Sequence, residues 1–503
     1  MCNLQAVSAT ERLPDRRRAR QPAGLVQDLR EELIFSPVAA LGALVVAVAM
    51  MIVFPRPADA LPSFARQTGQ PCGTCHTDQP GLTPFGRRFK LGGYTLGGGE
   101  FRTTPFPTTE EDKNKAWVPP VAMMAIIGYT HTQAPLPPPT DPFKPNDNVV
   151  VSPFSVFYGG AITEHIGAFA QVTHNAPPPG GFPDPFGHTW TWDNVDLRYA
   201  NTAKLGGLDV IYGITANNNP TVQDVWNTTP AWTFPYATST IAPTPGTKVL
   251  IDAAFAAHVG GVGGYVFIND MLYLEATGYS TLNFREQNSL GTDPFSAPGL
   301  FDGASPYWRA ALESHWANHW LEIGTFGMFA AVHPWADTVF FTPATFPQTD
   351  KYTDIGFDSQ YQYQGENYWF TLRGSYLHEH QRLDATFLKG GSANLTNELN
   401  SLRLQASLAY GSDNRFVLTG QYFNTWGTPD AIRYSGLASG FSPNSDGWIG
   451  EIAYIPFVTS GAPVWPWFNA RVGLQYIWYN KFDGDTVHAR DKNTLFLYAW
   501  LAM

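Results

Sequence analysis

A short motif at positions 72–76 carries the clearest chemistry in this sequence of 503 residues. Cys72 and Cys75 are separated by two residues, and His76 follows directly. This spacing suits two thioether bonds to the vinyl groups of one haem, with the imidazole presented to the iron. The alternatives are a redox-active dithiol and half of a zinc site, but no thioredoxin-like strand–helix–strand pattern and no second cysteine pair accompany the motif. The motif therefore predicts one covalently bound haem c.

The neighbourhood of the motif restricts where a second axial ligand to the iron can come from. Between Leu61 and Trp117, His76 is the only histidine and there is no methionine. A histidine or methionine ligand must therefore come from the rest of the chain, with a lysine of the segment as the alternative. We expect the segment that carries the haem to dock onto, or into, whatever follows it.

The residues around the motif are of the types that enclose a porphyrin. Apolar side chains that could cover its faces are Phe64, Leu82, Phe85, Phe89 and Tyr94. Basic side chains that could meet its propionates, with solvated surface as an equally good interpretation of each, are Arg66, Arg87, Arg88 and Lys90. About 50 residues is small for an independent core. Residues 61–110 are therefore predicted to form a monohaem cytochrome c segment that packs against the rest of the chain for its stability.

Residues 1–60 have the pattern of a cleaved export signal. An apolar run over residues 38–54 is followed by the small-x-small sequence Ala58-Asp59-Ala60 and preceded by four arginines, Arg16, Arg17, Arg18 and Arg20. The alternative is a retained transmembrane helix, because the run nearly reaches the roughly 18 residues that a span requires. Pro55 and Pro57 at its end favour cleavage before Leu61. Export is also what covalent haem attachment requires.

Composition narrows the fold class of the remaining chain. Charged residues make up 15% of the sequence and aromatic residues 14%, whereas a soluble domain carries roughly 25% charged residues. Hydrophobic residues at 44% are too many for a disordered chain. Acidic residues exceed basic residues by 42 to 31, so no nucleic acid is expected as a partner. This balance is typical of a membrane β-barrel or of a very large β-domain.

Polarity alternates with a period of two residues in stretches of roughly ten to fifteen residues from Trp117 onward, which is the signature of barrel strands. Sixteen strands are predicted, beginning near Trp117, Asn148, Ala161, His188, Leu205, Lys248, Val262, Tyr307, His319, Lys351, Glu366, Asn397, Asn414, Gly447, Trp467 and Asp491. An even number suits a bacterial barrel formed from one chain. Residues 111–503 are thus predicted to form an all-β, antiparallel outer-membrane barrel of about 16 strands. The alternative, a soluble β-sandwich or propeller, would have shorter strands or a blade-length repeat.

The predicted connections alternate in length. Long ones, rich in Pro, Gly, Asp and Asn, lie near residues 132–147, 175–187, 218–247, 284–306, 332–350, 379–396, 429–446 and 480–490. Short ones lie near Gly160, Lys204, Gly260, Trp316, Gly365, Gly411 and Gly461. Outer-membrane barrels place long loops outside the cell and short turns in the periplasm. This pattern puts both mature termini in the periplasm and lipid of the outer membrane around the barrel.

The first predicted strand, residues 121–131, supplies the candidate distal ligands of the haem. Residues 121, 123, 125, 127 and 129 share the face expected to contact lipid, and the even-numbered residues face the lumen, where small side chains leave room for a porphyrin. Met124 on the lumen face is the first candidate for the sixth ligand, with a packing methionine as the alternative. His131 is the second candidate, although it shares a face with Tyr129 and needs a bulge to turn inward. A methionine ligand would raise the haem potential.

Several segments of the sequence resemble the fused outer-membrane cytochrome–porins of iron-oxidising bacteria. The resemblance spans the mature chain and is most specific over residues 61–94, which contain the haem motif and Leu82-Thr-Pro-Phe-Gly-Arg-Arg-Phe-Lys-Leu-Gly-Gly-Tyr94. It extends to Thr130-His131-Thr132 and to residues 190–236, with Asp196-Leu-Arg-Tyr-Ala200 and Asn217-Asn-Asn-Pro-Thr-Val-Gln-Asp-Val-Trp-Asn. The resemblance implies one haem segment joined to a barrel, with Cys72 and Cys75 as attachment residues and His76 as proximal ligand.

The family also implies an activity, the oxidation of extracellular Fe(II) with electrons passed to a periplasmic cytochrome or other electron carrier. It supplies no iron-binding residues, so only acidic residues on long loops stand as candidates: Asp141, Asp147, Asp184 and Asp224. Two alternatives use the same haem motif. One is an electron conduit that serves a different extracellular redox partner, and the other is a diffusion porin with a structural or sensory haem.

Overall fold

The computed structural model describes residues 61–107, 110–136, 143–174, 189–334, 348–411, 413–437, 440–459 and 464–503. The predicted export signal, residues 1–60, lies outside these ranges, as do Asp141 and Asp184. Among the described residues, no helix is both long and apolar enough to cross a lipid bilayer.

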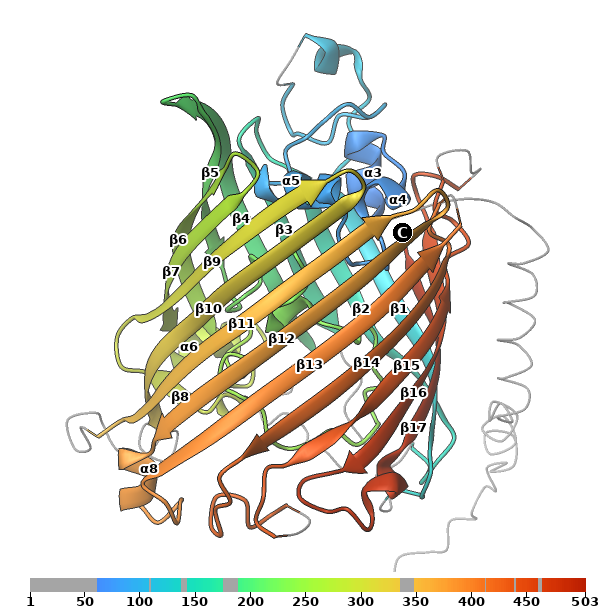
Figure 1. Cartoon of the computed structure of the whole chain (residues 1–503). Coiled ribbons are helices and arrows are strands. Elements are labelled where there is room, and N and C mark those ends of the chain that lie inside the picture. The colour runs from blue at the N-terminus through green and yellow to red at the C-terminus, as the bar shows by residue number, and fades with distance from the viewer. Residues whose placement is uncertain are drawn as a thin grey trace, which may run out of the picture. The chain divides into compact units, whose positions relative to one another are not determined.

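The chain from β1 onward is a closed antiparallel β-barrel (Figure 1). Sixteen long strands follow one another around the wall in chain order, and β17 pairs with β1 to close it. A short additional strand, β8, pairs with the far end of β10. The bounds are β1 Val121–Thr132, β2 Asn148–Ala161, β3 Ile166–His174, β4 Trp190–Leu205, β5 Leu208–Asn217, β6 Val259–Ile268, β7 Leu272–Thr281, β8 Gly299–Phe301, β9 Ser305–Trp316, β10 His319–Pro334, β11 Asp350–Gln364, β12 Tyr368–Arg382, β13 Thr396–Tyr410, β14 Phe416–Gly427, β15 Ser445–Tyr454, β16 Asn469–Lys481 and β17 Thr494–Ala502.

The two faces of the wall differ in polarity in the way that lipid requires. Outward-facing aliphatic side chains are largely exposed, for example 65% at Val262, 60% at Ile323 and 64% at Ile452. Their inward-facing neighbours are buried and often polar or charged, as are Arg309 and Gln362. An apolar outer band around a closed barrel is the arrangement that spans a bilayer, because every backbone group is paired within the wall. The predicted fold class, an outer-membrane barrel of about 16 strands, is confirmed.

One predicted strand is wrong. The strand expected from Lys248 does not form, because residues 250–258 fold as consecutive turns inside the barrel. β6 begins at Val259 instead, and the candidate beginning at Val262 is part of β6 itself. The tight turn expected near Gly260 lies at Asn269 and Asp270, both of which have positive φ. The number of long strands stays the same because β7 replaces the missing one.

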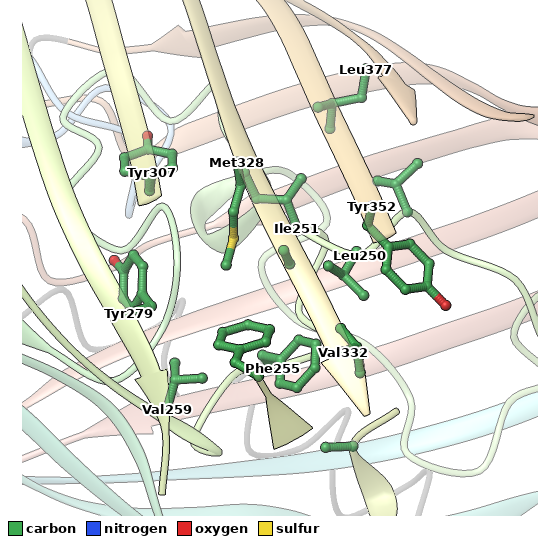
Figure 2. Close-up of a cluster of buried hydrophobic side chains, with 14 of the residues drawn as sticks. Leu250, Ile251, Phe255, Val259, Tyr279, Tyr307, Met328, Val332, Tyr352 and Leu377 are labelled. Carbon is green, nitrogen blue, oxygen red and sulfur yellow. The ribbon is translucent and has the colours of Figure 1, made fainter. Parts of the chain in front are cut away.

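A long connection, residues 218–258, folds back into the lumen. Its apolar residues pack against the inner wall in a buried cluster that includes Leu250, Ile251 and Phe255 (Figure 2). Backbone amides of the same segment donate to carboxylates of the wall, Leu250 to Glu379 and Ile251 to Asp354. The apolar character of residues 248–257 thus comes from burial in the lumen and not from a place in the sheet.

The residues before β1 form a compact plug in the mouth of the barrel. It contains α3 (Pro62–Thr68), α4 (Cys72–Cys75) and α5 (Pro84–Leu91). Figure 1 shows these helices at the barrel end where the chain also terminates, opposite the end that carries α8 (Asp384–Leu388). Short turns join the strands at the plug end, as at Gly206 and Gly207, and we call it the short-turn end.

Local sequence explains the plug helices. Pro84 occupies the first turn of α5, where a missing N–H costs nothing, and the Thr83 hydroxyl accepts from the Gly86 amide. Gly69 ends α3 in the left-handed conformation. The other helical segments are short and lie in connections: η1 Glu111–Asn114, η2 Pro230–Trp232, α6 Phe284–Ser289, η3 Pro294–Ser296 and η4 Ala489–Lys492.

Candidate haem site

His76 stands directly after α4, and its ring is oriented by the loop that follows. Its backbone amide donates to the Cys72 carbonyl at 2.8 Å, which closes the single turn of α4. The Nδ1–H donates to the Pro80 carbonyl at 3.0 Å, because a carbonyl can only accept. Nε2 is therefore the nitrogen left for a metal, held in the tautomer and orientation that ligating histidines adopt. Burial lowers the pKa of His76, which keeps the imidazole neutral as ligation requires.

A cavity of about 510 Å³ lies between the plug and the barrel wall. Its lining includes Cys72, Cys75, His76 and, from β1, Met124. The volume is within the roughly 300–1,000 Å³ of cofactor pockets. Burial raises the pKa of the Cys75 thiol to about 12. A redox-active cysteine requires the opposite, a lowered pKa, so this environment speaks against the dithiol alternative.

Aromatic and aliphatic side chains make the cavity apolar. Phe64, Phe89 and Tyr94 pack together in the plug, with ring centroids 5.0 to 5.9 Å apart. These three line the cavity. Further apolar side chains of the plug, the wall and the connection over residues 218–258, which we call the lumen loop, also line it: Leu61, Leu82, Phe157, Phe169, Trp232 and Trp500. Phe85, expected to cover the porphyrin, is instead 37% exposed and lies outside the lining.

Met124 and His131 are placed on opposite faces of β1. Met124 is buried at 8% exposure on the inner face and lines the cavity, as the alternation predicted. His131 is exposed, and its Nδ1 lies 2.8 Å from the Asp147 carboxylate. β1 has one irregularity, between Ala125 and Ile127 in its pairing with β2, and it does not turn His131 inward. Of the two distal candidates, the structure brings only Met124 to the cavity.

Three of the four predicted propionate partners have other roles. Arg66 donates to the Val121 carbonyl at 2.5 Å, and Arg87 forms an ion pair with Glu313 at 2.9 Å. Arg88 is exposed and pairs with Asp270. None of these three lines the cavity.

Lys90 alone of the four reaches the cavity lining. Its ammonium donates to the carbonyls of Val222 and Asp224 at 2.7 Å and lies 4.5 Å from the ring centroid of Trp232. Burial and, to a smaller extent, the positive charge of Arg198 lower the pKa of Lys90 to about 7, while nearby carboxylates act in the opposite direction.

The loop that follows His76 is held by the barrel wall. Asp78 is buried and accepts from Arg373 on β12 through both carboxylate oxygens, at 2.7 and 3.0 Å. Thr77, Tyr236, Gln405 and Ser407 also donate to this carboxylate. Burial alone would raise the pKa of Asp78, but the Arg373 charge and these donors hold it well below its ordinary value.

Arg471 on β16 holds the backbone of the same loop, donating to the carbonyls of Asp78 at 3.1 Å and Gln79 at 2.6 Å. Glycine is required at position 81, beside the Asp78–Arg373 pair, because a Cβ there would collide with both side chains. Sequence reasoning missed these anchors. The available signal was the set of inward-facing arginines and glutamines on strands predicted to line a lumen.

The iron-binding candidates on loops are not brought together. Asp224 is buried and accepts from the backbone amides of Trp226, Thr228 and Thr229 at 2.9 to 3.0 Å, so it organises the lumen loop and is not a loop ligand facing solvent. The Asp147 carboxylate accepts a hydrogen bond from the Tyr129 hydroxyl and also contacts Nδ1 of His131, both at the partly exposed end of β1. Within the described ranges, no group of three or more His, Cys, Asp or Glu side chains is arranged to hold a metal ion.

Comparisons with known proteins concern the barrel. No protein-family model and no curated protein matches the sequence. Among solved structures, the chain is similar to OmpF of Salmonella typhi in complex with daunomycin, at 11% identity and a TM-score of 0.43, over 76% of this chain and 97% of that one. It is also similar to an anion-selective porin from Comamonas acidovorans, at 11% identity and a TM-score of 0.40, over 76% and 98%. OprB of Pseudomonas putida gives 10% identity and 0.40, over 76% and 92%.

Proposed function

We propose that this outer-membrane barrel is a monohaem electron-transfer protein that oxidises extracellular Fe(II) and passes the electrons to a periplasmic carrier. The observation that supports it best is the convergence of Cys72, Cys75, His76 and Met124 on one apolar cavity inside the barrel mouth. The residues fit a haem c, since the two thiols and the free Nε2 of His76 border a space with aromatic walls. When bound, a haem supplies an iron that accepts and releases one electron.

The residues of the chain have separable roles in this proposal. Cys72 and Cys75 would form the thioether bonds, and His76 would bind the iron through Nε2 while Pro80 fixes its other nitrogen. Met124, on the wall, would supply the second ligand to the iron. The apolar lining excludes water and so favours a higher potential than an exposed site would have. A soft thioether ligand would shift the potential in the same direction, which suits acceptance of electrons from a weak reductant.

The position of the cavity restricts where Fe(II), the proposed electron donor, can deliver its electron. Met124 is near the short-turn end of β1, and Thr132 at the other end is eight residues away. At about 3.3 Å per residue this is roughly 26 Å along the strand. With the short-turn end in the periplasm, the cavity opens toward the periplasmic carrier. Fe(II) must therefore either enter the outer vestibule or deliver its electron through the packed lumen.

The packed lumen counts against the diffusion-porin alternative. The plug occupies the mouth, and residues 218–258 cross the lumen behind it. Solutes would have to displace buried contacts such as those of Phe255, which is 1% exposed. The second alternative, another extracellular donor, uses the same cavity and is separated from Fe(II) oxidation by experiment.

The proposal is tested by anaerobic visible spectroscopy of the protein purified in detergent, with Fe(II) added to the oxidised form. Rapid growth of reduced c-haem bands is expected, and the C72A/C75A protein serves as the haem-free control. The haem could be reduced by dithionite but not by Fe(II) at any pH at which the barrel is folded. That result would exclude Fe(II) as the electron donor and favour a different extracellular donor. Absence of covalent haem in a host able to attach it would overturn the proposal.

A further inference from the structure

We propose that Arg471, a residue of the barrel wall, positions His76 by holding the carbonyl groups of the loop that orients its imidazole. This inference rests on the haem site proposed above. It gives the wall a second role at the site, in addition to supplying Met124.

The contact begins at the guanidinium of Arg471. One nitrogen, Nη1, donates to the carbonyls of both Asp78 and Gln79, at 3.1 and 2.6 Å. Gln79 is joined by its peptide bond to Pro80, whose own carbonyl accepts from His76 Nδ1. The carbonyl fixed by Arg471 and the carbonyl that fixes the ring therefore belong to consecutive residues. A displacement of the Gln79 peptide must move the acceptor of the imidazole.

Arg471 is itself held rigidly. Its Nη2 pairs with Glu451 on β15 at 2.5 Å, and its Nε donates to the Tyr498 hydroxyl on β17 at 2.9 Å. The side chains of Arg471 and Glu451 are 4% and 1% exposed. A planar guanidinium engaged on three sides by the adjacent strands and by the plug cannot be replaced by the point charge of a lysine. The groups that orient His76 are thus fixed to three neighbouring strands of the wall.

Burial of this pair calls for an explanation other than stability. Desolvating two charges usually offsets the gain from their attraction, so a buried ion pair is weak evidence for a stabilising role. Conserving the position of a ligand is a different use of the same groups, since histidine ligands depend on the partner of their second nitrogen. Arg373 holds the Asp78 side chain, whereas Arg471 holds the backbone carbonyls of Asp78 and Gln79, next to the acceptor of the imidazole.

Arg198 on β4 provides a matched control. It too is a fully buried wall arginine, paired with an acid of its own strand, Asp196 at 2.8 Å. It too donates to a plug carbonyl, that of Lys90 at 3.2 Å. It makes no contact with residues 76–82 among the described hydrogen bonds. A general loosening of the plug should follow from both substitutions, whereas a change at the ligand should follow only from the loss of Arg471.

The experiment compares R471Q, R471K and R198Q in the full-length, haem-loaded protein. Covalent haem content, resonance Raman and magnetic circular dichroism spectra of the axial ligands, and the reduction potential are measured for each. R471Q is expected to keep wild-type haem content, because both cysteines are untouched, but to gain a second ligand-field species and to shift its potential. R471K is expected to restore the spectrum only in part, and R198Q to keep wild-type ligand spectra. Wild-type spectra and potential in R471Q would overturn the inference.

Tyr498→Phe provides a milder variant that tests the same contact if R471Q does not fold. It removes only the hydroxyl that fixes Arg471 Nε, and it should change the ligand spectra in the same direction to a smaller extent. If R471Q fails to assemble, wild-type spectra in Y498F overturn the inference. Wild-type protein without covalent haem would instead refute the proposed function, so the two failures are distinguishable.

Discussion

Removing the charge of Asp78 should release the plug from the wall without unfolding the barrel. Asp78→Asn keeps the size of the side chain but leaves Arg373, with 3% side-chain exposure, without its carboxylate partner. Breaking a buried pair by removing one partner costs about 3–5 kcal/mol. Arg373 retains the Trp226 carbonyl at 3.2 Å and the Tyr236 hydroxyl at 3.1 Å, which favours the lower part of that range. The opening equilibrium of the plug should therefore rise roughly 10²-fold to 10³-fold.

Amide hydrogen exchange read by mass spectrometry measures this opening. The amides of His76, Thr77 and Thr83 are hydrogen-bonded inside the plug and exchange only when it opens. They should exchange faster by the stated factor in D78N, while amides of β13 should keep their wild-type rates. Exchange within threefold of wild type at the plug amides would refute the account of the anchor.

The double variant D78N/R373M separates the ion pair from its neighbours. With both charges gone, no buried charge is left without a partner, so most of the protection should return. Protection in the double variant no better than in D78N would mean that Thr77, Gln405 and Ser407 hold the carboxyl position, and not Arg373.

Four further outcomes follow from the structure. Met124→Ala should convert a six-coordinate haem to a species with an open or water-bound sixth position, visible as a high-spin spectrum and a lower potential; an unchanged low-spin spectrum would remove Met124 as ligand. His131→Ala should leave the haem spectrum unchanged, since the ring lies on the outer face, and any loss of low-spin haem would contradict that placement. Deleting residues 61–110 should raise single-channel conductance only modestly, because residues 218–258 still cross the lumen, and a fully open pore would show that this loop depends on the plug. The pKa of Asp78 in the folded protein lies well below its ordinary 3.8. The stability that ionised Asp78 gives to the docked plug should therefore be complete above about pH 3.8 and be lost as the pH falls through the folded-state pKa. Plug amides that already exchange faster between pH 6 and pH 4, after correction for intrinsic rates, would contradict this.

The barrel could be predicted from the sequence for physical reasons that act locally. Alternation of polarity gives the number of long strands and the inward face of Met124, because each strand meets lipid on one side and the lumen on the other. The spacing of Cys72, Cys75 and His76 matches the two thioether bonds and one ligand of a haem c, and this haem stays a prediction. These features depend on neighbours in the chain and need no knowledge of the fold.

The missed features depend on distant parts of the chain. Residues 248–257 look like a strand because apolar residues buried in a filled lumen and apolar residues facing lipid have the same composition. The contact between Asp78 and Arg373 joins residues 295 positions apart, and the contact from Arg471 to Asp78 spans 393 positions. No local pattern marks which of the inward-facing arginines will meet the plug.

These long separations impose an order on biogenesis. The strands whose side chains hold the plug, β12, β13 and β16, lie hundreds of residues after Cys72 in the sequence and are synthesised later. Cys72 is 2% exposed in the complete barrel. If the proposed haem is present, the enzymes that attach it would have to act while Cys72 is still accessible, so attachment would precede closure of β17 against β1. Under the proposed function, the chain would then enter barrel assembly with its cofactor already attached, and closure of the wall would enclose the haem.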